Sequence, residues 1–291
     1  DLTYIGISVE LWLLSVSLSG HEYRMQLKLF KSKFINENVS LWDYDVVVVS
    51  SSAGKDSQTA LDVIVEKAKH ERYPLSNIIV VHADLGRVEW KDTKELAKRQ
   101  ADHYGLRFEI VSRPQGDLLD HIEKKGKFPD SARRWCTSDH KRAQISKVYT
   151  KITDEIRDGR KDYRVNILEV LGFRAQESHA RAKRIPFITN TRLTNTKRLV
   201  HTWLPIHEYT EDQVWARIKQ SGVEYHKAYD QGIDRLSCVF CIFAPKKQLE
   251  IAGRLNPELL DEYVRVEKKI GHSFKNNAPI SQIKETINHG G

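Results

Sequence analysis

Four consecutive valines end in a run of small and polar residues, and this junction could bind phosphate. Val46-Val47-Val48-Val49-Ser50-Ser51 is followed by Ser52-Ala53-Gly54-Lys55-Asp56-Ser57. Four β-branched residues in a row are typical of a strand buried on both faces. Small residues after such a strand let backbone N–H groups approach an anion at the start of the next helix. The Lys55 ammonium would add positive charge, and the Ser52 and Ser57 hydroxyls can donate to phosphate oxygens.

The chain has three cysteines, and their spacing suggests metal or sulfur chemistry. Cys238 and Cys241 form a Cys-x-x-Cys pair, and Cys136 lies far upstream in Arg133-Arg134-Trp135-Cys136-Thr137. Three thiolates could hold an iron–sulfur cluster with one iron left open. They could also hold zinc, with His140 or a non-protein group as the fourth ligand. A reversible disulfide or a set of free thiols is the alternative without a metal.

The elements that must position these residues follow from the pattern of apolar residues. We expect strands over 46–50, 77–82, 107–112, 166–171 and 200–204, and helices over 57–70, 91–104, 117–125, 137–157, 246–254 and 257–270. Another helix starts at Thr210. Cys136 falls in a loop, and the tail beyond Phe274 is expected to be polar and mobile. The alternation predicts an α/β fold: a mostly parallel five-stranded sheet with helices on both faces, Rossmann-like, plus a small C-terminal helical addition.

The same pattern divides the chain into three parts. Residues 1–44 form an N-terminal extension, 45–209 a nucleotide-binding α/β domain, and 210–291 a helical segment that carries the Cys-x-x-Cys pair. The only methionine is Met25, and the residues before it differ in sequence pattern from the rest of the chain. One hypothesis is therefore that Met25 is the native start and that residues 1–24 are not native.

Composition limits the kind of protein this is. The formal net charge of +8 favours a polyanionic partner such as a nucleotide, a nucleic acid or an acidic carrier protein, although it can also serve solubility alone. Three cysteines do not resemble a secreted disulfide framework, which favours a cytoplasmic location. The apolar stretch from Tyr4 to Leu18 contains Glu10 and is too short to span a bilayer comfortably, so no membrane partner is expected.

Several motifs together resemble one family. Ser52 to Ser57 is similar to the Ser-Gly-Gly-Lys-Asp-Ser PP-loop of ATP pyrophosphatases and phosphoadenylyl-sulfate reductases, with Ala53 in place of the first glycine, and it lacks Walker-loop spacing. Gly172-Phe173-Arg174-Ala175-Gln176-Glu177-Ser178 resembles the Gly-Ile-Arg-Ala-x-Glu-Ser motif of the phosphoadenylyl-sulfate reductase family, and Asp84-Leu85-Gly86 resembles its Asp-Thr-Gly. Leu204-Pro205-Ile206, Val214-Trp215 and Tyr229-Asp230-x-Gly232 extend the likeness, which runs from Asp45 to Phe243.

This resemblance implies an adenine nucleotide α-hydrolase-like fold with the nucleotide across the carboxyl ends of the strands. Arg174 is the leading second anion contact, unless it forms a salt bridge to Glu177. Asp84 would bind Mg²⁺ or a ribose hydroxyl, unless it only caps a helix. The implied nucleotide-binding residues are Ser52, Ala53, Gly54, Lys55, Asp56, Ser57, Asp84, Gly86, Gly172, Arg174 and Glu177.

The cysteine pattern decides which activity is expected. Because no cysteine follows Cys241 in this sequence, the thiosulfonate mechanism of the sulfonucleotide reductases is in doubt. The pattern instead looks like that of the sulfurtransferase component of DNA phosphorothioation and of cluster-bearing tRNA thiolases. We therefore expect ATP-dependent adenylation and sulfur transfer to a nucleic acid or another acceptor. The expected catalytic residues are Lys55, Asp56, Arg174, Cys238 and Cys241.

The expected ligands and partners depend on this activity. They are ATP or another adenine nucleotide, Mg²⁺, a [4Fe–4S] cluster in preference to zinc on Cys136, Cys238 and Cys241, and a sulfur donor such as a cysteine desulfurase. Arg133-Arg134, Lys141-Arg142 and the stretch from Arg181 to Arg184 are candidates for nucleic-acid phosphates, or else solvated helix faces. A sulfonucleotide reductase is the second hypothesis. A non-catalytic nucleotide-sensing or DNA-binding module is the third.

Overall fold

The computed structural model describes residues 39–276 and 278–289. The predictions for residues 1–24, and for most of the 1–44 extension, lie outside the described residues. The described chain begins with a short 3₁₀ helix, η1 (Leu41–Asp43), just before the first strand.

Six strands form one sheet in the order β3-β2-β1-β4-β6-β5. They are β1 (Val46–Ser51), β2 (Ile78–Asp84), β3 (Arg107–Ser112), β4 (Val165–Leu171), β5 (Phe187–Thr189) and β6 (Arg198–Trp203). Every neighbouring pair is parallel except β5 and β6. The predicted α/β class with a mostly parallel sheet is confirmed. The count of five strands is wrong, because Phe187–Thr189 adds a three-residue edge strand antiparallel to β6.

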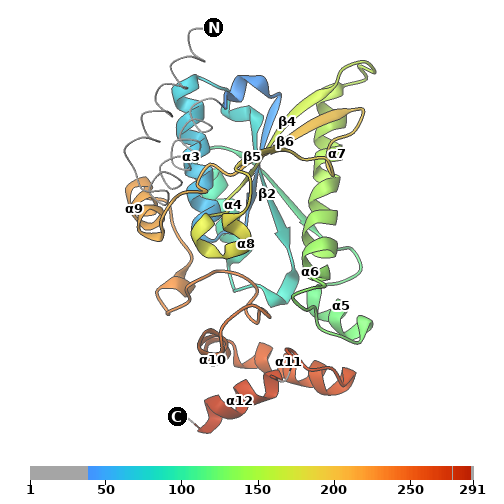
Figure 1. Cartoon of the computed structure of the whole chain (residues 1–291), viewed down its shortest axis with the longest axis vertical. Coiled ribbons are helices and arrows are strands. Elements are labelled where there is room, and N and C mark those ends of the chain that lie inside the picture. The colour runs from blue at the N-terminus through green and yellow to red at the C-terminus, as the bar shows by residue number, and fades with distance from the viewer. Residues whose placement is uncertain (1–38, 277, 290–291) are drawn as a thin grey trace, which may run out of the picture.

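Helices cover both faces of the sheet, as predicted (Figure 1). They are α3 (Lys55–Glu71), α4 (Thr93–His103), α5 (Leu118–Lys125), α6 (Trp135–Thr137), α7 (Ala143–Arg157), α8 (His179–Ala182), α9 (Glu211–Ser221), α10 (Lys246–Leu255), α11 (Pro257–Ile270) and α12 (Ile280–His289). No helix in the described part of the chain combines the length and apolar character that a membrane span requires.

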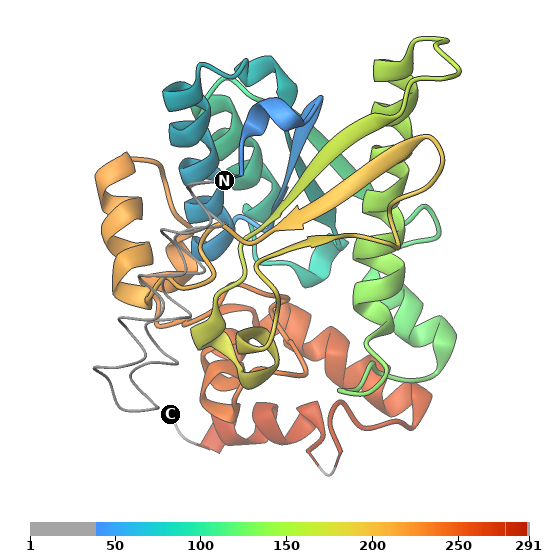
Figure 2. The ribbon, with the colours of Figure 1, turned by 45° about the horizontal axis from the view of Figure 1, so that its top comes forward.

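Alternating strand residues build two separate cores. Val47 and Val49 face α3 with Leu61 and Ile64, whereas Val46 and Val48 join a cluster that includes residues of α7. Figure 2 shows α7 on one side of the sheet, and α3 with α9 on the other. Because β1 is buried on both faces, its carboxyl end is held rigidly. Chain order reverses between β1 and β4, and such a switch point opens a crevice at the strand ends.

Two local predictions are wrong. Cys136 does not lie in a loop but in the single turn of α6, which a π-helical segment (Ser138–Arg142) connects to α7. The tail beyond Phe274 is not without structure, because it forms α12 and buries Ile280 and Ile283.

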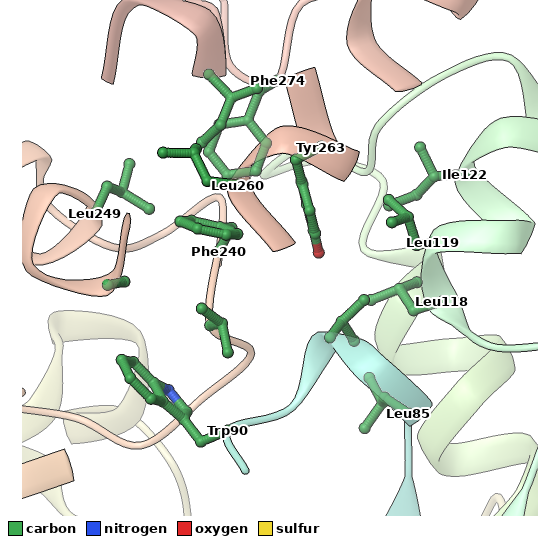
Figure 3. Close-up of a cluster of buried hydrophobic side chains, with 14 of the residues drawn as sticks. Leu85, Trp90, Leu118, Leu119, Ile122, Phe240, Leu249, Leu260, Tyr263 and Phe274 are labelled. Atoms are coloured by element: carbon green, nitrogen blue, oxygen red, sulfur yellow. The ribbon is translucent and has the colours of Figure 1, made fainter. Parts of the chain in front are cut away.

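A third core joins the C-terminal helices to the region beyond β2. It contains Leu85 and Trp90 after β2, Leu119 of α5, Phe240 between the two cysteines of the pair, and Tyr263 of α11. Figure 3 shows Tyr263 between Phe240 on one side and the leucines of α5 on the other. This packing holds the cysteine-bearing segment near the carboxyl end of β2.

Candidate active site

The loop after β1 has the geometry of an anion cradle. Ser57 Oγ accepts a hydrogen bond from the Ser52 N–H at 3.1 Å and donates one to the Gly54 carbonyl at 2.9 Å. The Ala53 N–H donates to Ser51 Oγ at 3.1 Å, and Ala53 has a φ of 56°. Gly54 is the N-cap of α3 and has no side chain to satisfy the first turn. The Lys55 N–H is bonded to Tyr229, so the N–H groups that this helix end offers to a phosphate are those of Asp56 and Ser57.

Gly172 packs directly against this helix start. A Cβ atom at Gly172 would lie 2.5 Å from the Asp56 carbonyl oxygen and 2.7 Å from the Ser57 nitrogen. Since neither contact is with a flexible side chain, only glycine fits here. The end of β4 therefore fixes the position of the loop after β1.

Arg174 and Asp56 form a buried ion pair beside the loop. The Arg174 side chain is 4% exposed, and its Nε donates to Asp56 Oδ1 at 2.5 Å. Its Nη1 donates to Gln176 Oε1 at 2.8 Å. Burial raises the pKa of the Asp56 carboxyl, and the hydrogen bond from Arg174 opposes that shift.

The alternative partner for Arg174, Glu177, contacts it differently. Glu177 accepts from the Arg174 backbone N–H at 3.0 Å, and its carboxylate pairs with Arg181. The salt bridge between the Arg174 and Glu177 side chains, which was the alternative to anion binding, is therefore absent from the ion pairs of the described residues.

Lys55 is held by residues from a distant part of the chain. Its amino group donates to the Asp234 carbonyl and lies 3.2 Å from Glu211 Oε1, while its backbone N–H donates to the Tyr229 hydroxyl at 2.8 Å. Sequence analysis missed Glu211, Tyr229 and Asp234 as neighbours of the loop. The only signal was the Tyr229-Asp230-x-Gly232 motif, whose place in the fold the spacing does not reveal.

Asp84 caps the turn after β2. Its Oδ1 accepts from the Gly86 N–H at 2.7 Å, and Lys94 Nζ lies 3.7 Å from Oδ2. Gly86 has a φ of 77°, and a Cβ there would lie 2.4 Å from the Asp117 Cβ. Asp84 thus closes a turn and is not the N-cap of the following 3₁₀ helix, which is Leu85. Binding of Mg²⁺ or a ribose hydroxyl stays a prediction. Asp84 and Gly86 both line a cavity of about 410 Å³.

The three cysteines converge in one region. Cys136 and Cys238 pack against the third core, and all three are free thiols. Burial, together with the nearby Cys241, raises the pKa of Cys136 and raises that of Cys238 to about 12. Within residues 39–276 and 278–289, however, no three His, Cys, Asp or Glu side chains are arranged to hold a metal ion.

His140 is engaged elsewhere. Its Nε2 lies 3.0 Å from His121 Nδ1, and its buried Nδ1 has no hydrogen-bond partner in the described chain. Burial lowers the pKa of His140 to about 4, so its ring is neutral at pH 7. Its role as a fourth zinc ligand stays a prediction.

A buried polar connection joins the loop strand to the cysteine pair. His82 Nδ1 lies 3.1 Å from the Ser51 carbonyl oxygen, and His82 Nε2 lies 3.2 Å from Glu89 Oε2. Glu89 in turn forms a backbone bridge with Cys238, and the Val239 N–H donates to the Val88 carbonyl at 2.8 Å. The candidate nucleotide loop and the cysteine pair are thus parts of one packed unit.

The sequence motif profile decides the family. The phosphoadenosine phosphosulfate reductase domain matches residues 46–244. This chain belongs to the phosphoadenosine phosphosulfate reductase family. The PP-loop resemblance expected from Ser52 to Ser57 is thereby confirmed at the family level.

The similar proteins include both uncharacterized proteins and named reductases, and the share of their length that this chain covers differs. An uncharacterized protein of Methanocaldococcus jannaschii is 26% identical over 223 residues, which cover 77% of this chain and 48% of the relative. The adenosine 5'-phosphosulfate reductase of Allochromatium vinosum is 25% identical over 203 residues, which cover 68% of this chain and 69% of the enzyme. The chain spans about half the length of the first curated relatives it matches.

Solved structures include a phosphate complex of the phosphoadenylyl-sulfate reductase of Candida auris. It is 15% identical to this chain, with a TM-score of 0.48, and the match covers 76% of this chain and 96% of that one.

Proposed function

We propose that this family member binds ATP at the loop after β1 and transfers an adenylyl group to an acceptor. The buried Arg174 beside the loop is the observation that carries this proposal. Its Nε and Nη1 are bonded to Asp56 and Gln176, while Nη2 donates to no acceptor in the described residues. A guanidinium buried with an unused N–H group can grip a phosphate oxygen.

The reaction uses these groups in turn. An acceptor oxygen attacks the α-phosphorus of ATP, the bond to the bridging oxygen of the β-phosphate breaks, and pyrophosphate leaves. The N–H groups at the start of α3 and the Arg174 guanidinium stabilise charge on the leaving pyrophosphate. Lys55 can contribute once it leaves Glu211, because that ion pair is half exposed on the Glu211 side. Mg²⁺, for which Asp84 is the proposed ligand, would neutralise phosphate charge.

The cysteines supply the second half of the proposed function. A sulfur donor such as a cysteine desulfurase would load a persulfide on Cys241. The persulfide attacks the adenylated carbon of a nucleic-acid acceptor, and AMP leaves. Cys238 then attacks the Cys241 sulfur, which frees the thiolated acceptor and forms a Cys238–Cys241 disulfide. A dithiol reductant restores the two thiols.

A [4Fe–4S] cluster on Cys136, Cys238 and Cys241 is the other proposed sulfur carrier. The thiols are the donors that a cluster needs. As described, however, these residues are not arranged as a three-ligand group, and so no step is assigned to a cluster. Iron and sulfide analysis after anaerobic purification tests it, with Cys136→Ser as the variant that should lose both elements.

Pyrophosphate release from ATP tests the adenylation step. Purified protein is incubated with ATP, Mg²⁺ and either single-stranded RNA or single-stranded DNA. Arg174→Ala should reduce the rate about 100-fold, as loss of one charge-stabilising group does elsewhere. Arg254→Ala is the control, because Arg254 is exposed on α10. Tight ATP binding with no pyrophosphate release in the presence of any acceptor would instead support the non-catalytic module.

A sulfonucleotide reductase is the second candidate. Two relatives named adenosine 5'-phosphosulfate reductase, from Allochromatium vinosum and Staphylococcus haemolyticus, are each 25% identical to this chain. In this case Cys238 or Cys241 would attack the sulfur of the sulfonucleotide. Sulfite release from adenylyl sulfate in the presence of thioredoxin would favour the reductase over adenylation.

A further inference from the structure

An exposed aromatic side chain lies beside the cysteine pair. Phe243 follows Cys241 by two positions and is 48% exposed. The guanidinium carbon of Arg134 lies 5.3 Å from the centre of its ring. Since Arg134 precedes Cys136 by two positions, this contact joins the two segments that carry the cysteines at the protein surface.

The two arginines at this contact form no ion pair in the described part of the chain, unlike several other arginines. Arg99, Arg107 and Arg217 each form ion pairs with two carboxylates. By contrast, Arg133 and Arg134 are exposed and have no carboxylate within ion-pair distance in the described chain.

Asp130, the acidic residue nearest to the two arginines in sequence, does not neutralise them, and Lys141 adds a third positive charge to this surface. Asp130 Oδ1 accepts backbone N–H groups of Ala132 and Arg133, at 2.8 and 2.6 Å, and forms no ion pair with either arginine. Lys141 is half-buried, follows Cys136 by five positions and forms no ion pair in the described part of the chain. The surface beside the cysteines is therefore cationic and carries one aromatic face.

We propose that Phe243 and Arg134 form a stacking platform for an unpaired base of a single-stranded nucleic acid. Arg133 and Lys141 would contact the adjoining phosphates. Aromatic and guanidinium planes stack on bases, but bases inside a duplex have no free face. The proposal rests on the proposed function and adds to it: the acceptor is a single strand, held next to Cys241.

Binding without catalysis tests the platform. Fluorescence anisotropy gives the Kd of labelled single strands of RNA and DNA and of the matching duplexes, without ATP. Phe243→Ala should weaken single-strand binding by about 5- to 150-fold, the range for loss of one stacked base. Phe243→Trp should restore it. Ile188→Ala is the matched control, because Ile188 on β5 is 46% exposed.

The arms of the experiment separate this proposal from its rivals. Equal affinities for the wild type and Phe243→Ala, or duplex binding as tight as single-strand binding, would overturn the platform. Binding of an acidic protein partner, with no affinity for either single strand, would also overturn it. Tighter binding of RNA than of DNA, or the reverse, together with the Phe243→Ala loss, supports the platform and identifies which strand is the ligand.

Failure of the proposed function gives a different result. If the variants change single-strand binding as expected but no acceptor releases pyrophosphate from ATP, adenylation is wrong and the platform stands. If pyrophosphate release occurs with an acceptor other than nucleic acid, and no strand binds, the platform alone is wrong.

Discussion

At the scale of single residues, Ala53 shows how a departure from the family motif is tolerated. Its φ of 56° is a left-handed conformation that costs an alanine roughly 1–2 kcal/mol. Its methyl group is fully buried in the third core, which offsets about 0.8 kcal/mol. Ala53→Gly would relieve the strain and lose the burial. We therefore expect a change in the free energy of unfolding of less than about 1 kcal/mol, measured by urea titration; a larger loss would mean that the methyl group fixes the loop.

Gly172 allows no such exchange. Gly172→Ala would place a Cβ atom 2.5 Å from the Asp56 carbonyl oxygen and so displace the start of α3. We expect the affinity for ATP, measured by calorimetry, to fall at least tenfold, or about 1.4 kcal/mol.

Gly105→Ala is the matched control for this substitution. Gly105 has a φ of 66°, but a Cβ there would meet nothing within 4 Å. The control should lower stability by about 1 kcal/mol and leave ATP affinity unchanged. Equal ATP affinities for the Gly172 variant and the wild type would show that the loop does not bind the nucleotide.

The parts of the candidate site that could be predicted are a local loop and a motif at a strand end. Ser52 to Ser57 form their loop locally, and a strand-end motif placed Arg174 at the same edge. The contacts of Lys55 with Glu211 and Tyr229 join residues more than 150 positions apart, and no local pattern reveals them. The ion pair of Arg174 with Asp56, rather than with Glu177, depends in the same way on how β4 meets α3.

At the scale of elements, Glu267 anchors the C-terminal helix. Its carboxylate accepts backbone N–H groups of Phe274, Ile280 and Ser281 at 2.8, 2.9 and 3.2 Å. Glu267→Ala would leave these groups unsatisfied in a buried place. We expect a loss of about 2–4 kcal/mol in the free energy of unfolding.

Limited proteolysis checks the same variant locally. Cleavage between α11 and α12 should become faster in Glu267→Ala. Glu285→Ala is the control on α12, away from these N–H groups, and it should stay within about 0.5 kcal/mol of the wild type. An unchanged cleavage rate for Glu267→Ala would show that apolar packing alone holds α12 in place.

The elements that were missed share one physical cause. The tail beyond Phe274 carries a short helical stripe, Ile280, Ile283 and Ile287, among polar residues. The helix α12 forms because these isoleucines pack on the third core and Glu267 satisfies its first N–H groups. Phe187–Thr189 is too short to show a strand period and exists because β6 offers an edge. The long strands and helices, by contrast, show the apolar periodicity of their element in their own sequence, and they were predicted to within a few residues.

At the scale of the whole molecule, the net charge of +8 is distributed unevenly. Arg174 is buried and paired, whereas Arg133 and Arg134 lie exposed beside the cysteines. Salt screens exposed charges much more than buried ones. The affinity for single-stranded nucleic acid should therefore depend more strongly on salt than the affinity for ATP.

Salt titration turns this difference into a measurement. If Arg133 and Lys141 each neutralise a phosphate while Arg134 stacks on a base, the logarithm of the single-strand association constant should fall against the logarithm of salt concentration with a slope of about −1.4. Arg133→Gln should make the slope shallower by about 0.7, because one fewer counterion is released. Arg254→Gln should leave it unchanged. ATP affinity at fixed Mg²⁺ should vary less with salt, because its anchoring guanidinium is buried; equal slopes for both ligands would mean that the nucleotide binds at the exposed cationic surface rather than beside Arg174.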